Sequence, residues 1–476
     1  MDEFLGKRSE GDWWIVDEPA TRFSGVLELD SRAHGHLTLK GTENQFRTIL
    51  AKGMRRERWT MHGEMKSGYT YRVSLFNVGM TRGPRIGRSP DDLTDAQVFT
   101  NVILIGGHIG DQCDAVVKRA SLEIGGLREF VDDNGFVGKL DNPGARSGEE
   151  DVQVSFKGRK TPIFALSQGR ALRIISGYRG PRMFFTPKTV TMEESDRLEL
   201  VFESPISTDA LLHEMVVWQS FLVFATRRAS YMGEIRIGMP ESKIDFPYLL
   251  LVPGTPKEPD VDPRGPHELL FTKSKLGPKL EQYLRAWRTN FEVVEISIVL
   301  FTGTMYQEGQ YLHTRLLSYL QALEILHREV YGGCRFPDKK VWTATLRALK
   351  RAIPYFLDRE LRDEISRQLS FVGTITLLDR LKALYRIYPQ SLRQLFPDGE
   401  IDLTLLKNAR NFLTHYGAQK KFDRDFLLSR QLYVLSEKTR LFVEICLLGI
   451  LGLNDKEIVD LLGKFEPYTA WALEKH

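Results

Sequence analysis

The sequence predicts an α+β protein in which a β-rich N-terminal domain precedes an all-α helical bundle. Up to about residue 260, short runs rich in β-branched and aromatic residues alternate with Gly, Asp and Asn turns. Beyond that point, apolar residues recur at the three- and four-residue spacing of amphipathic helices. A proline-rich stretch separates the two patterns.

The N-terminal domain is expected to span residues 1–252 and to form a sandwich or a jelly-roll-like barrel. Its strand-like runs are WWIVD, FSGVLELD, HGHLTLKG, YRVSLFNVG, VFTNVILIGG, DVQVSF, ALRIISG and RLELVFE. One helix, Asp209 to Thr226, is rich in Leu, Val, Trp and Phe and is expected to pack on a sheet. Residues 253–284 are expected to be a linker, because six prolines fall between Pro253 and Pro278.

Residues 285–476 are expected to form the helical domain, a bundle with short connections. The predicted helices cover residues 307–331, 338–353, 357–370, 375–387, 402–416, 422–449 and 454–463. The longest apolar run, Leu441 to Leu453, contains Glu444 and is too short to span a bilayer, so it is expected to be a buried helix.

The composition is that of an ordinary globular protein, with 42% hydrophobic and 27% charged residues. Cys113, Cys334 and Cys446 form no paired motif, so we expect neither a disulfide framework nor a cysteine metal site. This pattern favours a reducing cytoplasm. The first residues, MDEFLGKRSEGDWW, contain no apolar signal core, and we expect neither secretion nor a membrane partner.

The segment from Arg410 to His415 is the strongest functional candidate. Leu405, Leu406, Ala409, Phe412, Leu413 and Tyr416 form one apolar helical stripe, with Asp402 expected to cap the start and Gly417 the end. Asn411 and His415 lie one turn apart on the opposite face. A solvated helix face with ordinary polar residues is the alternative interpretation. The surrounding region, residues 335–430, holds 19 Lys or Arg against 11 Asp or Glu, a charge that attracts phosphate backbones.

Other polar groups are weaker candidates. Glu324 sits at the edge of the apolar stripe of the helix 312–330, either paired with an arginine or orienting Arg410 or His415. His34 and His36 share one side of a strand but lack a third metal ligand. The Gly-rich segment 106–110 lacks a P-loop ending and is expected to be a hairpin turn. No metal or cofactor site is therefore predicted.

The Arg410 to His415 segment resembles the Arg-(4 to 6 residues)-His signature of HEPN ribonucleases, in which a polar residue, often Asn, follows the Arg. The upstream helix LHTRLLSYLQALEILHREV looks like the long first helix of the ApeA-like abortive-infection branch, and the β-rich region is similar in character to that family's N-terminal domain. The resemblance implies a homodimer through the C-terminal domain, a role in anti-phage defence, and RNA, with tRNA as one candidate, as the substrate.

The expected activity is metal-independent RNA cleavage by 2′-OH attack. His415 is the expected proton-transfer group, since histidine titrates near pH ~6.5, and Arg410 the expected phosphate ligand; Asn411 and Glu324 would support them. The β-rich domain is expected to sense an unknown trigger ligand or phage component, with the arginine-containing loop 80–92 as one binding surface. Two alternatives remain: a non-catalytic HEPN module that binds a nucleotide or protein, and a carbohydrate-binding β protein with a helical dimerisation domain.

Overall fold

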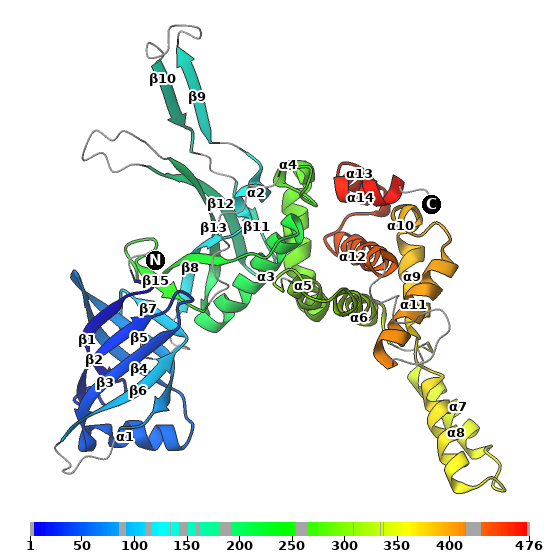
Figure 1. Cartoon of the computed structure of the whole chain (residues 1–476), viewed down its shortest axis with the longest axis horizontal. Coiled ribbons are helices and arrows are strands. Elements are labelled where there is room, and N and C mark those ends of the chain that lie inside the picture. The colour runs from blue at the N-terminus through cyan, green and yellow to red at the C-terminus, as the bar shows by residue number, and fades with distance from the viewer. Residues whose placement is uncertain are drawn as a thin grey trace. The chain divides into compact units, whose positions relative to one another are not determined.

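The computed structural model shows an α+β chain made of two compact units, Met1–Glu281 and Gln282–His476. It describes residues 4–84, 92–110, 116–133, 135–141, 151–158, 162–180, 192–253, 265–307, 309–333, 335–336, 338–415 and 430–473. The predicted order, β-rich first and helical second, is confirmed (Figure 1). Among the described residues, no helix is both long and apolar enough to cross a membrane.

The N-terminal unit begins with a closed antiparallel barrel. Its strands, in sheet order, are β5 (Tyr69–Arg82), β4 (Trp59–Ser67), β1 (Arg8–Ile15), β2 (Arg22–Leu29), β3 (Gly35–Thr42) and β6 (Leu93–Thr100), and β6 pairs back onto β5. Alternating apolar residues such as Trp13, Phe23 and Leu75 fill the interior. Helix α1 (Glu43–Met54), started by a Thr42–Gln45 capping box, lies across one end of the barrel (Figure 1).

The β-rich character and the barrel agree with the expected sandwich or jelly-roll-like barrel, and the same sheet continues beyond the barrel with further strands. The strands that follow β5 are β7 (Val102–Ile105), β15 (Tyr248–Leu251), β14 (Met232–Gly238), β8 (Val116–Ile124), β13 (Glu193–Ser207), β12 (Arg170–Arg179) and β11 (Phe164–Ala165). The 14-residue β5 makes this possible, because residues 73–76 pair with β7 whereas residues 79–82 pair with β6. A separate hairpin is formed by β9 (Phe136–Asp141) and β10 (Asp151–Phe156).

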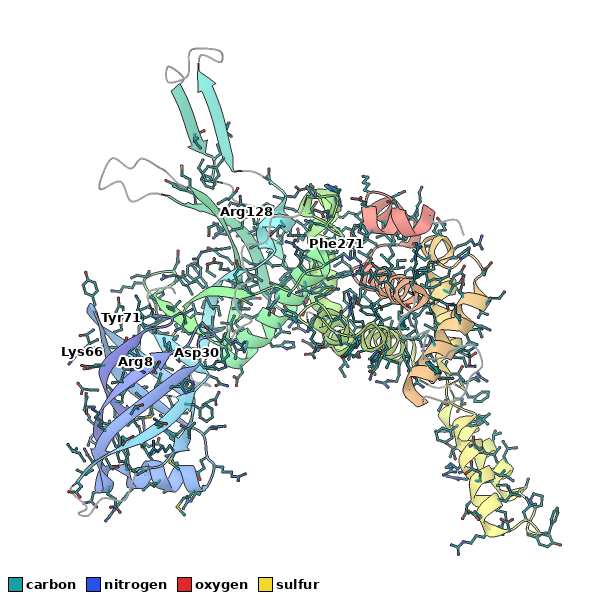
Figure 2. All side chains as sticks on the ribbon, in the orientation of Figure 1. Arg8, Asp30, Lys66, Tyr71, Arg128 and Phe271 are labelled. Carbon is teal, nitrogen blue, oxygen red and sulfur yellow. The ribbon has the colours of Figure 1, made fainter. Side chains whose placement is uncertain are left out.

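Helices cover the extended part of this sheet. Helix α3 (Thr208–Thr226) packs on β8 and β13, as the sequence predicted, and contacts α2 (Leu127–Val131). Phe271, labelled in Figure 2, packs its ring against Phe130 and Phe221 at centroid distances of 6.3 and 5.6 Å. The sequence analysis assigned residues 265–281 to the linker. This segment instead contributes core residues and contains α4 (Lys273–Leu276) and the 3₁₀ turn Gly277–Lys279. Residues 254–264 lie outside the described part.

The C-terminal unit is helical. Its helices are α5 (Leu280–Gly303), α6 (Leu312–Tyr331), α7 (Lys339–Arg351), α8 (Arg359–Phe371), α9 (Leu377–Ile387), α10 (Pro389–Leu395), α11 (Glu400–His415), α12 (Arg430–Ile450), α13 (Asp455–Leu462) and α14 (Glu466–Leu473). Helix α6 is the centre of the bundle, since α9, α11 and α12 all contact it. Helices α7 and α8 form a hairpin, drawn in yellow in Figure 1. Helix α5 was not among the predicted helices.

Candidate functional site

Helix α11 carries the candidate motif, and its buried side matches the predicted stripe. Leu406, Ala409, Phe412 and Leu413 are buried, whereas Arg410 and Asn411 are half-buried on the other side. The helix begins two residues earlier than predicted, at Glu400, so Asp402 is not its cap. The Asp402 carboxylate instead accepts the N–H of Asp398 at 3.1 Å and stabilises the turn before the helix. Tyr416 and Gly417 lie outside the described residues.

The motif presents one cation, Arg410, that has no carboxylate partner in the described part of the chain. Nη1 of Arg410 lies 3.4 Å from Oδ1 of Asn411, a long contact, and the other guanidinium donors form no hydrogen bond with the described residues. Within the described part of the chain, Arg410 forms no ion pair. The Thr414 hydroxyl donates to the Arg410 carbonyl at 2.7 Å, so its hydrogen is used within the helix. The backbone of His415 ends α11, and its side chain lies outside the described part.

Glu324 on α6 is half-buried and interacts electrostatically with Arg380 on α9. No hydrogen bond or ion pair joins Glu324 to Arg410 in the residues that the structure describes. Helices α6, α9 and α11 nevertheless contact one another in pairs, so both arginines belong to the same three-helix group. Glu324 thus belongs to a second cluster on this group of helices.

That cluster contains a buried cation that the sequence analysis did not single out. Arg380 and His327 are 5% and 4% exposed, and Nη1 of Arg380 lies 3.2 Å from Nδ1 of His327. Burial, with the positive charge of Arg380, lowers the pKa of His327. The signal was present in the sequence, because Arg380 flanks the apolar stripe of Leu377, Leu381 and Leu384.

Arg380 differs in its carboxylate partners from Arg440, a half-buried cation of the same bundle. Arg440 on α12 pairs with Glu437 and lies 3.8 Å from Glu444, so two carboxylates balance its charge. Among the described residues, Glu324 is the one carboxylate that interacts with Arg380, and it does so electrostatically, without an ion pair. The buried Nε atoms of Arg380 and Arg440 both lack a hydrogen-bond partner among the described residues. A buried guanidinium with an unfilled donor favours an anion or a polar ligand nearby.

The weaker candidates in the N-terminal unit have local partners. Nδ1 of His34 lies 2.9 Å from Oδ2 of Asp30 in a turn, and across the described residues no group of three or more His, Cys, Asp or Glu is placed to hold a metal. The segment 106–110 is not a hairpin turn, because β7 and β8 are not neighbours in the sheet. It folds over β4 instead, where Nε2 of His108 lies 3.0 Å from the Gly63 carbonyl oxygen. Part of the loop 80–92, including Arg85 and Arg88, lies outside the described residues.

Two family models match the chain in the order of its two units. ApeA N-terminal domain 1 matches residues 8–287, and the Apea-like HEPN model matches residues 317–457, which include most of α6 and all of α9 and α11. No curated protein and no solved structure matches the chain. The first match alone covers more than half of the 476 residues and the second contains the Arg410 to His415 segment, so the chain belongs to the ApeA-like HEPN family.

Proposed function

We propose that the protein is a metal-independent endoribonuclease of anti-phage defence whose site is formed by Arg410, Asn411 and His415. The observation that carries the proposal is Arg410 itself: a half-buried cation that has no carboxylate partner among the described residues, beside an amide and five residues before a histidine on the same helix. The match to the Apea-like HEPN model over residues 317–457 supports it. A guanidinium of this kind can bind an RNA phosphate through two parallel hydrogen bonds.

The reaction that these groups support is transfer of the phosphodiester onto the neighbouring 2′-oxygen. The 2′-OH loses its proton and attacks phosphorus, the bond to the 5′-oxygen breaks, and that oxygen takes up a proton, leaving a 2′,3′-cyclic phosphate and a 5′-hydroxyl. Arg410 would stabilise the negative charge on the phosphorane oxygens. His415 would transfer a proton, favoured in its charged form by the C-terminus of α11. Asn411 would orient His415 or the 2′-OH.

The proposal includes a homodimer, because one histidine supplies a single proton-transfer group. Cleavage in line needs a base at the 2′-oxygen and an acid at the 5′-oxygen, on opposite sides of the phosphorus. Two copies of α11 related by a two-fold axis would supply both. The N-terminal unit would act as the sensor that restrains or triggers this site, in a cytoplasmic protein.

The most direct test in cells is to express the wild type beside His415→Ala and to follow growth and RNA integrity. The nuclease proposal expects slow growth and fragmented RNA with the wild type, and normal growth with intact RNA for His415→Ala at equal protein level. Arg410→Ala serves as the companion variant. A non-catalytic binding module predicts intact RNA in all three cultures, and that outcome would refute the nuclease.

A further inference from the structure

Helix α7 carries its charge on one side. It contains five basic residues and no acidic one: Lys339, Lys340, Arg347, Lys350 and Arg351. At 100° per residue these positions fall within an arc of about 120°, whereas Trp342, Leu346 and Ile353 fall on a separate arc and are half-buried. From Lys340 to Arg351 the helix rises about 17 Å. The hairpin therefore presents a row of cations along one edge.

In the described part of the chain, no carboxylate pairs with this row. Lys340, Arg347, Lys350 and Arg351 form no ion pair with any residue that the structure describes. The neighbouring helix α8 differs, because Arg359 pairs with Asp363 and Arg367 pairs with Glu364. The same hairpin thus has a compensated helix and an uncompensated one. Uncompensated cations at helical spacing attract a polyanion, and the Coulomb attraction is screened by salt.

The connection between the two helices exposes aromatic rings. Tyr355 is 87% exposed, the highest value among the large apolar side chains that the structure describes, and Phe356 is 78% exposed. Their ring centroids lie 6.4 Å apart in an edge-on arrangement. Exposed aromatic rings next to cations match the way in which proteins hold unpaired bases, which stack on rings while the phosphates follow the positive charge.

The base of the hairpin is fixed to the bundle. The Arg335 N–H donates to the Gly373 carbonyl at 2.9 Å, and its guanidinium pairs with Asp379 of α9. Phe336 stacks on Trp342 at 4.7 Å, and Gly373 leaves room for this indole, because a Cβ there would lie 2.6 Å from it. The cations of α7 therefore sit on a held element, which limits the entropy lost when a ligand binds.

We propose that α7 and the Tyr355–Phe356 tip form an RNA-binding arm that takes RNA with unpaired bases. The inference rests on the proposed function, since it names the substrate class that the arm would deliver to α11. Charge complementarity favours RNA over a second copy of the hairpin, because a second α7 would bring cations against cations. An anionic membrane fits less well, since membrane helices carry aromatic groups along one long face, whereas here they cluster at one end.

The test uses the full-length protein and an unstructured fluorescent 2′-fluoro RNA of about 20 nucleotides, longer than a typical single-strand site, which 2′-OH attack cannot cut. Binding is measured by anisotropy between about 50 and 200 mM salt. The double variant Arg347→Gln/Arg351→Gln should weaken binding roughly tenfold and reduce the slope of log K against log salt by about 1.4. The matched control Arg359→Gln/Arg367→Gln removes the same charge from α8 and should change affinity by less than about twofold.

The tip is tested separately. Tyr355→Ser/Phe356→Ser should weaken binding of the unpaired RNA by about tenfold with an unchanged salt slope, and should leave binding of the same sequence as a duplex unaffected. Equal losses of RNA affinity in the α7 and α8 double variants would overturn the proposed RNA-binding arm. A slope of log K against log salt in the α7 variant equal to that of the wild type would overturn it as well. Binding to phosphatidylserine vesicles in place of RNA, or loss of a dimer in the tip variant by sedimentation, would also overturn it.

The arm and the nuclease can fail independently. If no form of the protein cuts natural RNA but the α7 variant loses affinity and salt slope as stated, the arm stands and the nuclease fails. If His415→Ala abolishes cleavage while every arm variant binds as the wild type does, the nuclease stands and the arm fails. Unchanged far-ultraviolet circular dichroism and melting temperature of each variant exclude unfolding as the cause.

Discussion

Nη1 of Arg380 lies 3.2 Å from Nδ1 of His327, and the direction of this hydrogen bond fixes the state of the histidine. A guanidinium has only donors, so Nδ1 must accept, and the imidazole is neutral with its proton on Nε2. The lowered pKa of His327, caused by burial and by Arg380, agrees with that assignment. A protonated His327 would place two cations against each other inside the bundle.

Removing this acceptor should destabilise the C-terminal unit. His327→Leu leaves the Arg380 guanidinium buried without it and is expected to cost about 2 kcal/mol or more in the free energy of unfolding. His327→Asn places an amide oxygen near the position of Nδ1 and should cost clearly less. Urea unfolding of both variants measures the difference. Equal stability of the two variants would contradict a role for the acceptor.

The same hydrogen bond predicts a pH dependence. The folded pKa of His327 lies below the unfolded value of 6.5, so the folded state binds its proton more weakly. Above pH 6.5, neutral His327 makes its full contribution to the free energy of unfolding. This contribution is lost as the pH falls from 6.5 to the folded pKa. The wild type should therefore lose stability relative to His327→Asn between pH 8 and pH 5. A constant difference across that range would show that His327 does not titrate as described.

Asp196 in the N-terminal unit predicts the opposite trend. Burial raises the pKa of its carboxyl, with a further contribution from Glu194, although the Ser176 hydroxyl donates to it. Below pH 3.8, the unfolded pKa, the carboxyl is protonated in both the folded and the unfolded state. As the pH rises through the folded pKa, the folded state must bury a charged carboxylate, and the free energy of unfolding of the wild type falls. Asp196→Asn keeps an acceptor for Ser176 and should raise the melting temperature at pH 7, by about 2–4 °C per kcal/mol gained. Ser176→Ala is the control, and it should lower the melting temperature.

Subunit mixing tests the shared site. Arg410→Ala protein added to the wild type should lower RNA cleavage below that of the same amount of wild type alone. The reason is that mixed dimers would hold only one complete set of Arg410 and His415 groups. Activity is measured at a fixed wild-type concentration after exchange. The control is Arg359→Gln, on the hairpin and outside the proposed site, which should not reduce activity. Full activity of a monomer, identified by light scattering, would rule out the shared site.

The sequence predicted the fold order because periodicity reports which face of an element is buried. Strand runs in the N-terminal half and helices such as α6, α9 and α11 appear close to the expected positions. Helix α5 was missed because its end reads FEVVEISIVLF, in which β-branched residues imitate a strand. Its buried residues Trp287, Phe291, Val294, Ile298 and Phe301 nevertheless repeat every three or four positions. Spacing was a better guide here than residue type.

The candidate site was predictable only in part, since spacing along one helix says nothing about other helices. The half-buried Arg410 and Asn411 follow from the α11 stripe, whereas the pairing of Arg380 with His327 depends on packing of α9 against α6. In the same way, the barrel closes because β5 changes partner from β7 to β6, a choice that no local pattern encodes. Long-range pairing decided both features.

The central claim, RNA cleavage by 2′-OH attack at Arg410 and His415, is tested most directly with a defined RNA in EDTA. The wild type should cut it and leave a 2′,3′-cyclic phosphate, and a single 2′-deoxy substitution at the cut nucleotide should abolish cleavage there. His415→Ala should lower the rate by about 10²-fold or more. Strict dependence on added Mg²⁺ or Mn²⁺, or cutting of the 2′-deoxy position at the wild-type rate, would contradict the account.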